Sequence, residues 1–180
     1  MKRVKLWDKE FEISLPYADI QSAIQEMAAK MIADLEGKEP LFICILNGAF
    51  MFASQLMKEV ELPDAEISFL KLASYSGTSS SGDVKELIGL NEEIAGRTVV
   101  ILEDIVDTGH TMKGVKEQLI QKGAADVRIA TLLFKPDALK VKLDLDYVGI
   151  VIPNDFIVGF GLDYDRRGRN FKDIYTLVKE

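Results

Sequence analysis

Short apolar runs that alternate with helical patterns constrain the fold of this chain more than any other feature. Residues 41–46 read LFICIL, and residues 97–102 end in VVIL. Continuous runs of this kind are typical of strands that are buried on both faces of a parallel sheet. Further strands are expected at 66–74, 127–134 and 147–152.

Helical patterns fill the intervals between these runs. Apolar residues at spacings of three and four predict an amphipathic helix over residues 20–35, which Gly37 and Pro40 end. Shorter helices are expected at 49–57 and 112–121. Strands that alternate with helices favour an α/β fold, a mostly parallel twisted sheet flanked by helices. No repeat or linker divides the 180 residues, so we expect one domain spanning 1–180.

Charge and composition narrow the possible partners and the compartment. The chain has 22 basic and 29 acidic residues, a net charge of −7, which argues against binding to nucleic acid. A small anionic substrate remains compatible, because backbone amides and magnesium supply local positive potential. The lone Cys44 cannot form an internal disulfide, and neither a signal-peptide core nor an apolar span of about 20 residues is present. We therefore expect a cytoplasmic protein without membrane contact.

Acidic residues and a glycine turn follow the apolar run at 99–102. Residues 99–111 read VVILEDIVDTGHT, so Glu103 and Asp104 are expected at the end of a strand and Asp107 before a turn into a helix. Ligands bind at the carboxyl ends of parallel strands, and amides at a helix start suit a phosphate. Carboxylates beside a phosphate would repel it unless they bind sugar hydroxyls or magnesium, which indicates a phosphorylated sugar. The alternative is that Glu103 and Asp104 are surface charges and Asp107 is a helix cap.

Five segments, in order along most of the chain, resemble the type I phosphoribosyltransferases. Residues 99–111 are similar to the family's phosphoribosyl pyrophosphate (PRPP) signature. Within them, the sequence of 103–111 most resembles the hypoxanthine-guanine branch of the family. LNGAF at 46–50 resembles the pyrophosphate loop, and Ser74 and Tyr75 with 76–83 resemble the lid. FKP at 134–136 and residues 152–169 resemble the purine-binding segments. The resemblance implies the family fold, with a small hood formed by the chain ends.

The resemblance also implies a reaction. Phosphoribose would pass from PRPP to a six-oxopurine, hypoxanthine and also guanine, giving IMP or GMP and pyrophosphate with Mg²⁺ as cofactor. Glu103 and Asp104 would hold the ribose hydroxyls, directly or through magnesium, and Asp107 would be the general base. The 5′-phosphate would be held at the turn that follows β-strand residues 97–102, by Asp107, Thr108, Gly109, His110 and Thr111. Family members form homodimers and homotetramers, so we expect a homo-oligomer.

His110, the only histidine, has two interpretations. It titrates near neutral pH and is therefore a candidate catalyst. The resemblance favours the other interpretation, in which only its backbone amide contacts the phosphate.

The predicted pyrophosphate loop consists of Leu46, Asn47 and Gly48, whose backbone amides would face pyrophosphate together with Arg169. The family usually carries a non-proline cis peptide bond here, a conformation found mostly at functional sites. Asn47 departs from relatives that have lysine at this position. Without the resemblance, residues 47–48 are simply a strand-to-helix turn.

Residues 76–83 have two interpretations as well. Their serines and glycines are typical of a plain linker. The resemblance implies a lid in which Ser74 and Tyr75 close over the reacting centre and exclude water.

The purine would be held by residues from three segments. Lys135 would donate to the six-position oxygen, Phe156 would stack on the base, and Ile105 would line the opposite face. The Ile157 backbone would run along the base edge, and Asp163 would bind a second magnesium through water. From the residues alone, Phe156 is interpreted as an ordinary core aromatic and Lys135 as a solvated lysine at a strand end.

Two hypotheses of other classes remain from the sequence. One is a regulator that keeps this fold but binds nucleic acid, and the net charge of −7 opposes it. The other is a nucleotide-cofactor oxidoreductase, which needs a glycine-rich fingerprint after its first strand, whereas residues 47–49 offer a single glycine.

Overall fold

A computed structural model describes residues 2–72 and 86–179 of the chain. The predicted lid residues Ser74 and Tyr75, and all of residues 76–83 with them, lie outside the described residues. Within the described ranges, no helix is both long and apolar enough to cross a membrane.

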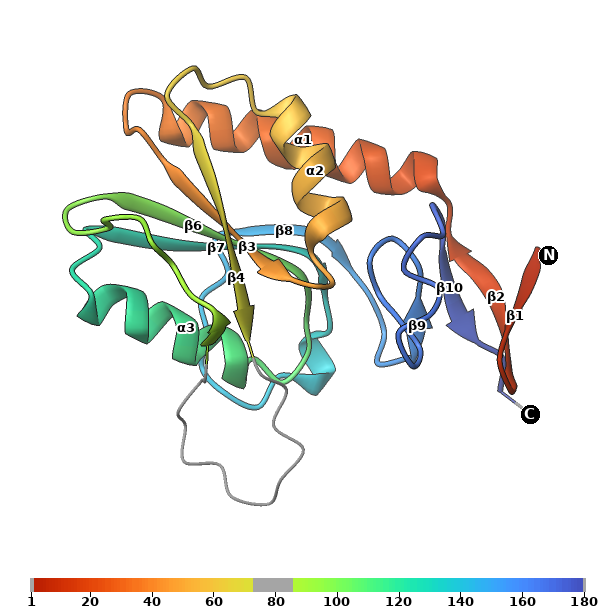
Figure 1. Cartoon of the computed structure of the whole chain (residues 1–180). Coiled ribbons are helices and arrows are strands. Elements are labelled where there is room, and N and C mark those ends of the chain that lie inside the picture. Colours follow the sequence, from red (N-terminus) through yellow and green to blue (C-terminus); the bar gives the residue numbers. More distant parts are fainter. Residues whose placement is uncertain (1, 73–85, 180) are drawn as a thin grey trace.

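The larger sheet of the described chain has six strands in the order β5-β4-β3-β6-β7-β8 (Figure 1). Its parallel strands are β3 (Leu41–Leu46), β4 (Glu66–Leu72), β6 (Thr98–Val106), β7 (Asp126–Phe134) and β8 (Tyr147–Val151). The short strand β5 (Glu86–Ile88) pairs antiparallel with β4 at one edge. The prediction of a mostly parallel α/β sheet is therefore confirmed.

Helices cover both faces of this sheet. Helices α1 (Tyr17–Leu35) and α2 (Phe50–Glu59) lie on one face, and α3 (His110–Gln121) lies on the other (Figure 1). Along β3, Phe42 and Cys44 pack in the cluster that contains α1 and α2, whereas Leu41 and Ile43 pack in the cluster that contains α3. Successive strand residues point to opposite faces, so the uninterrupted apolar runs follow from burial on both sides.

The structure corrects the predicted end of one strand. Strand β6 continues four residues past position 102, because Ile105 and Val106 pair with Leu133 and Phe134 of β7. Glu103 and Asp104 therefore lie within the last part of the strand instead of following it. Helix α3 begins at His110, two residues earlier than predicted, since the left-handed conformation of Gly109 (φ 82°) turns the chain directly into it.

A second sheet is built from both ends of the chain. Strands β1 (Arg3–Leu6), β2 (Lys9–Leu15), β10 (Ile174–Leu177) and β9 (Ile157–Val158) pair antiparallel in that order within the described residues. Figure 1 shows this hood beyond the end of β8 and next to the start of α1. The expected hood is confirmed. A 3₁₀ turn, Pro136–Ala138, follows β7 in the larger unit.

Asp173, just before β10, fastens the hood to α1. Its Oδ1 accepts a hydrogen bond from the Tyr17 backbone N–H at 3.0 Å, and the Lys2 ammonium donates to Oδ2 at 3.0 Å. The Tyr175 hydroxyl also donates to Oδ2, at 3.3 Å. Burial alone would raise the pKa of Asp173, but these donors hold it below the usual value. One buried carboxylate thus joins the N-terminus, the first helix and the last strand.

We expect Asp173→Ala to lower the free energy of unfolding by about 1–3 kcal/mol at pH 7, because three donors lose their acceptor. Asp173→Asn should lose less, since its amide oxygen still accepts from Tyr17. The folded-state pKa lies below the unfolded one, so the contribution is complete above the unfolded value of 3.8 and disappears as pH falls through the folded value. Urea unfolding at pH 7 and pH 2.5 measures both effects. Equal stability of Asp173→Ala and the wild type at pH 7 would contradict this role.

Candidate active site

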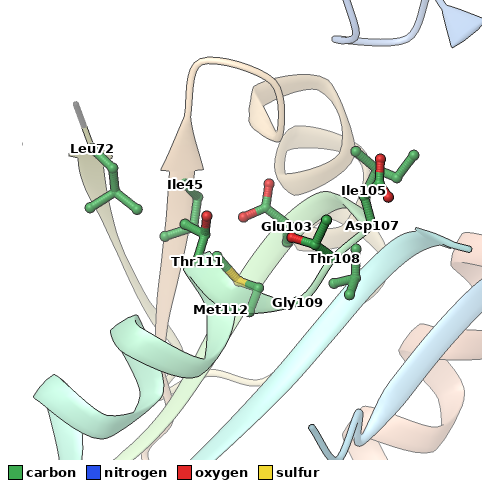
Figure 2. A pocket seen from close by; sticks show the side chains of 10 residues that line it. Ile45, Leu72, Glu103, Ile105, Asp107, Thr108, Gly109, Thr111 and Met112 are labelled. Atoms are coloured by element: carbon green, nitrogen blue, oxygen red, sulfur yellow. The ribbon is translucent and has the colours of Figure 1, made fainter. Parts of the chain in front are cut away.

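A pocket of about 290 Å³ opens where the strands of the larger sheet end. Figure 2 shows its side chains gathered around the carboxyl ends of β3, β4 and β6 and the start of α3. This is the edge of a parallel sheet at which ligands bind, since the loops that follow the strands meet there. The lining residues are Ile45, Leu72, Glu103, Ile105, Val106, Asp107, Thr108, Gly109, Thr111 and Met112.

The turn from β6 into α3 forms one wall of this pocket. Gly109 occupies the N-cap position, and no side chain caps the helix. The alternative of Asp107 as a helix cap is therefore wrong. Uncapped amides at a helix start attract anions, and Thr108 and Thr111 add hydroxyls to the same wall. The His110 side chain is exposed and is not part of the pocket lining.

The chain that follows β7 supports this turn from behind. A Cβ on Gly109 would come within 2.7 Å of the Leu139 side chain, so glycine permits close packing there. The Lys140 backbone N–H donates to the Thr108 carbonyl at 3.0 Å, and that of Lys135 donates to the Val106 carbonyl at 3.0 Å. The turn and the segment after β7 are thereby held as one unit.

Glu103 and Asp104 form a desolvated acidic pair. Glu103 lines the pocket, whereas the Asp104 carboxylate lies against Gly48, where a Cβ would overlap it. Burial raises the pKa of Glu103 well above its usual value, and the neighbouring Asp104 raises it further. Burial also raises the pKa of Asp104, against the opposing influence of its hydrogen bonds and of the Arg169 charge. A buried carboxylate beside a half-buried one favours a cation or hydroxyl donors as ligand.

The predicted pyrophosphate loop lies between Asp104 and the hood. The Leu46–Asn47 peptide bond is cis, which confirms that prediction, and the Asn47 side chain is exposed. Gly48 contacts Asp104 on one side, and on the other a Cβ on Gly161 would overlap the Gly48 carbonyl. Sequence reasoning gave Gly161 no role. The sequence Gly-Phe-Gly at 159–161 was the available signal.

Lys135 and Asp107 converge on the same part of the cleft. The Lys135 side chain is only 9% exposed, so the alternative of a solvated lysine at a strand end is wrong. Its Nζ lies 3.8 Å from Oδ2 of Asp107, whose side chain is 50% exposed and lines the pocket. A buried ammonium and an accessible carboxylate are thus presented side by side.

Arg169 is held by the hood loop that the resemblance assigned to the purine. Its Nη2 lies 2.7 Å from Oδ1 of Asp163, and its Nη1 donates to the Gly161 carbonyl at 2.7 Å. The Arg166 backbone N–H donates to the other Asp163 oxygen at 2.6 Å. The charge of this guanidinium is close enough to Asp104 to lower the pKa of that carboxyl, against the effect of burial. The Asp163 carboxylate, predicted to serve a second metal, is therefore engaged by the protein itself.

Phe156 is exposed, and its neighbour Ile157 is buried. The Phe156 side chain is 47% exposed, so a place in the core is excluded for it. Ile157 belongs to β9, and its backbone pairs with Thr176. Ile105 is half-buried at the pocket wall.

The donor set suits magnesium that is shared with a substrate. Among the described residues, no group of three or more acidic, histidine or cysteine side chains is close enough to enclose a metal ion. Mg²⁺ normally takes one or two carboxylates from the protein and completes its shell with phosphate oxygens and water. Glu103 and Asp104 provide such a pair.

The apolar walls of the pocket were not predicted. Ile45, Leu72, Val106 and Met112 line it beside the polar residues. The period of two along β3, which places Ile45 on the face of Leu41 and Ile43, was the signal that could have found one of them.

Comparison with known proteins agrees with this geometry. Residues 16–165 match the family described as the phosphoribosyl transferase domain, and the chain belongs to this family. It is 42% identical over 163 residues, 90% of each chain, to a hypoxanthine-guanine phosphoribosyltransferase of Streptococcus agalactiae. A solved hypoxanthine phosphoribosyltransferase of Staphylococcus aureus superposes with a TM-score of 0.88 at 38% identity, covering 93% of this chain and 91% of that one. A Trypanosoma cruzi hypoxanthine phosphoribosyl transferase gives 0.88 at 31% identity, covering 97% and 95%. The oxidoreductase alternative is thereby excluded.

We expect Gly48→Ala to weaken PRPP binding roughly 5- to 150-fold, since overpacking costs roughly 1–3 kcal/mol and the added methyl group would overlap the Asp104 carboxylate. Isothermal titration calorimetry with PRPP and Mg²⁺ measures the change. Gly96→Ala, away from the pocket, is the control: nothing lies within 4 Å of the added atom, but the positive φ of 76° strains alanine, so it should lower stability slightly and leave PRPP affinity unchanged. Equal affinities for Gly48→Ala and the wild type would show that this close approach does not position the loop.

Proposed function

We propose that this protein salvages purines by transferring phosphoribose from PRPP to hypoxanthine or guanine, which yields IMP or GMP and pyrophosphate. The observation that carries the proposal is the buried Lys135 beside Asp107, at the rim of a pocket that also holds Glu103 and the uncapped start of α3. The 42% identity to a hypoxanthine-guanine phosphoribosyltransferase over 90% of the chain supports the same activity. The proposal treats residues 1–180 as one catalytic domain.

The 5′-phosphate of PRPP binds at the turn before α3. In this proposal the backbone amides of Thr108, Gly109, His110 and Thr111 donate to the phosphate at the uncapped start of the helix, and the Thr111 hydroxyl donates as well. Asp107 lies at the entrance to the turn, and its carboxylate restricts the position that the phosphate can take there. A phosphate here places the ribose toward β6, within reach of the acidic pair.

Glu103 and Asp104 hold the ribose 2′- and 3′-hydroxyls, directly or through Mg²⁺. Both carboxylates are desolvated, so hydroxyl donors or a cation stabilise their charged forms. When bound, Mg²⁺ supplies positive charge that stabilises the departing pyrophosphate. A second ion would reach Asp163 through water, in keeping with the protein partners that both of its oxygens already have.

Pyrophosphate lies on the loop of Leu46, Asn47 and Gly48. The backbone of this loop and the Arg169 guanidinium provide donors, and Gly161 holds that guanidinium in place. Ser74 and Tyr75 close over the reacting centre in this proposal and exclude water from the cationic sugar carbon.

The protein recognises the purine at the edge that carries the oxygen on position six and the imidazole nitrogen next to it. Lys135 donates to the oxygen, and Asp107 removes the proton from the nitrogen as the other imidazole nitrogen attacks the sugar. The 3.8 Å between the two side chains suits these adjacent atoms of one edge. Phe156 stacks on one face, Ile105 lines the other, and the Ile157 backbone follows the remaining edge.

The oligomeric state and the cellular compartment are part of the same proposal. We place the protein in the cytoplasm as a homodimer or homotetramer that binds neither nucleic acid nor membrane, in keeping with its charge of −7. Analytical ultracentrifugation distinguishes these assemblies from a monomer.

A pyrophosphate-release assay with hypoxanthine, guanine, xanthine, adenine and uracil tests the activity. We expect release with hypoxanthine and guanine that depends on Mg²⁺, and almost none with adenine or uracil. Preference for adenine or uracil, or no release with any base, would overturn the proposal.

We expect Asp107→Asn to lower kcat about 10²- to 10⁴-fold while PRPP affinity stays within a fewfold, because the amide cannot accept the purine proton. Steady-state kinetics and calorimetry separate the two effects. Asp137→Asn, which removes an exposed carboxylate from the neighbouring 3₁₀ turn, is the control. Wild-type turnover in Asp107→Asn would remove this residue from the catalytic role.

Lys135→Ala tests the reading of the six-position. Lysine carries three donors and no acceptor, so it meets a carbonyl oxygen well and the adenine amine donor to donor. Mismatches of this kind reject an analogue by on the order of 10⁴-fold. We expect the kcat/KM ratio of hypoxanthine over adenine to be large in the wild type and to collapse in Lys135→Ala but not in Lys140→Ala, which alters an exposed lysine nearby. An unchanged ratio in Lys135→Ala would show that another group reads this position.

A further inference from the structure

The turn of the N-terminal hairpin contacts the loop that carries the purine-site residues. Trp7 and Asp8 join β1 to β2, and the Tyr164 hydroxyl donates a hydrogen bond of 2.8 Å to Oδ1 of Asp8. The Arg167 guanidinium lies 5.0 Å from the centre of the Trp7 ring. Two backbone hydrogen bonds between Tyr164 and Arg167, of 3.0 and 3.1 Å, close the loop into a tight turn. Two side-chain contacts therefore clamp residues far apart in sequence.

The Tyr164 ring also packs against the ring of Phe156. The edge of one ring meets the other at 85°, with 5.9 Å between their centres. Phe11 of β2 lies 6.2 Å from Phe156 and 6.1 Å from Tyr164, so the three rings touch in pairs. Phe11 is fully buried, whereas Phe156 keeps 47% of its surface exposed. Phe156 is thus held from behind by two rings and presents the rest of its surface outward.

We propose that Asp8 is a positioning residue for the purine site, which acts through Tyr164 on the ring of Phe156. The inference rests on the proposed stacking of Phe156 on the base. Asp8 itself touches no substrate. It fixes the Tyr164 hydroxyl, and Tyr164 in turn limits the orientations that an exposed Phe156 ring can adopt. A ring that is already oriented binds a planar base more tightly, because less side-chain freedom is lost on binding.

The charges around Tyr164 favour its hydrogen bond to Asp8. The hydrogen bond to Tyr164 lowers the pKa of Asp8, and the same contact raises the pKa of Tyr164, so the tyrosine is the donor and the aspartate is charged. The Lys9 ammonium lies 5.9 Å from the centre of the Tyr164 ring, on the side of the same hairpin. The hairpin therefore holds this tyrosine by its hydroxyl and by its ring face.

Kinetics of Asp8→Ala and Tyr164→Phe test the inference. Tyr164→Phe keeps the ring beside Phe156 and removes only the donor to Asp8. We expect each variant to raise KM for hypoxanthine about 3- to 10-fold, because a Phe156 ring that is no longer held must be ordered when the base binds, with kcat and KM for PRPP within twofold. The double variant should be no worse than the stronger single one, since both remove one interaction. Glu10→Ala, which removes an exposed carboxylate from the same hairpin, should leave all three parameters unchanged.

Phe156→Ala is measured beside these variants to separate the two proposals. If Phe156→Ala leaves KM for hypoxanthine unchanged, the stacking in the proposed function is wrong and the inference is overturned with it. A rise for Phe156→Ala without a rise for Asp8→Ala or Tyr164→Phe overturns only the inference. Equal rises in KM for hypoxanthine and PRPP would also overturn it, because they indicate general loosening of the hood.

An NMR measurement decides the structural part without turnover. We expect the ring resonances of Phe156 to shift in Asp8→Ala and Tyr164→Phe but to stay in place in Glu10→Ala. Unchanged Phe156 resonances in the first two variants would overturn the inference whatever the kinetics show.

Discussion

Burial of the larger sheet on both faces is the constraint on which the rest of the structure depends. Apolar residues of β3 and β6 pack on α1 and α2 with one set of side chains and on α3 with the alternate set. Polar groups therefore gather at the edge where the strands end and the chain leaves the sheet. The pocket, the uncapped start of α3 and the acidic pair all lie at this edge.

The same burial sets the electrostatic character of the site. Glu103 and Asp104 belong to a strand whose preceding residues, Ile101 and Leu102, are fully buried, and burial raises the pKa of both acids. A protein rarely keeps two desolvated carboxylates together without a ligand or counter-charge. Arg169 supplies part of that charge from the hood. The site thus couples the two sheets electrostatically as well as through the glycine contact of Gly48 and Gly161.

Local patterns predicted the larger sheet well and the hood poorly. Strand β3 has the bounds expected from its apolar run, because that run has no polar interruption. The end of β6 was missed because Glu103 and Asp104 resemble a strand terminus, whereas pairing of Ile105 with Leu133 continues the strand. Strand β2 pairs with β10 from the other end of the chain, and no local pattern indicates a pairing over that distance. Short antiparallel strands also carry weak sequence signals. The type of each site residue could be read from the motifs, but the burial of Lys135 and the exposure of Phe156 depend on tertiary packing.

The hood has a consequence for the order in which the molecule can assemble. Tyr17 and Asp173, which bond to each other, are 156 positions apart, and β2 pairs on one side with β10. A ribosome releases the N-terminal residues first, so β1 and β2 wait as an isolated hairpin, a structure that is marginal alone in water, while the parallel sheet forms from residues already made. The turn proposed to bind the phosphate can therefore exist on a nascent chain before the surface proposed for the base is closed. Substrate recognition at the base becomes the last property that the growing chain acquires.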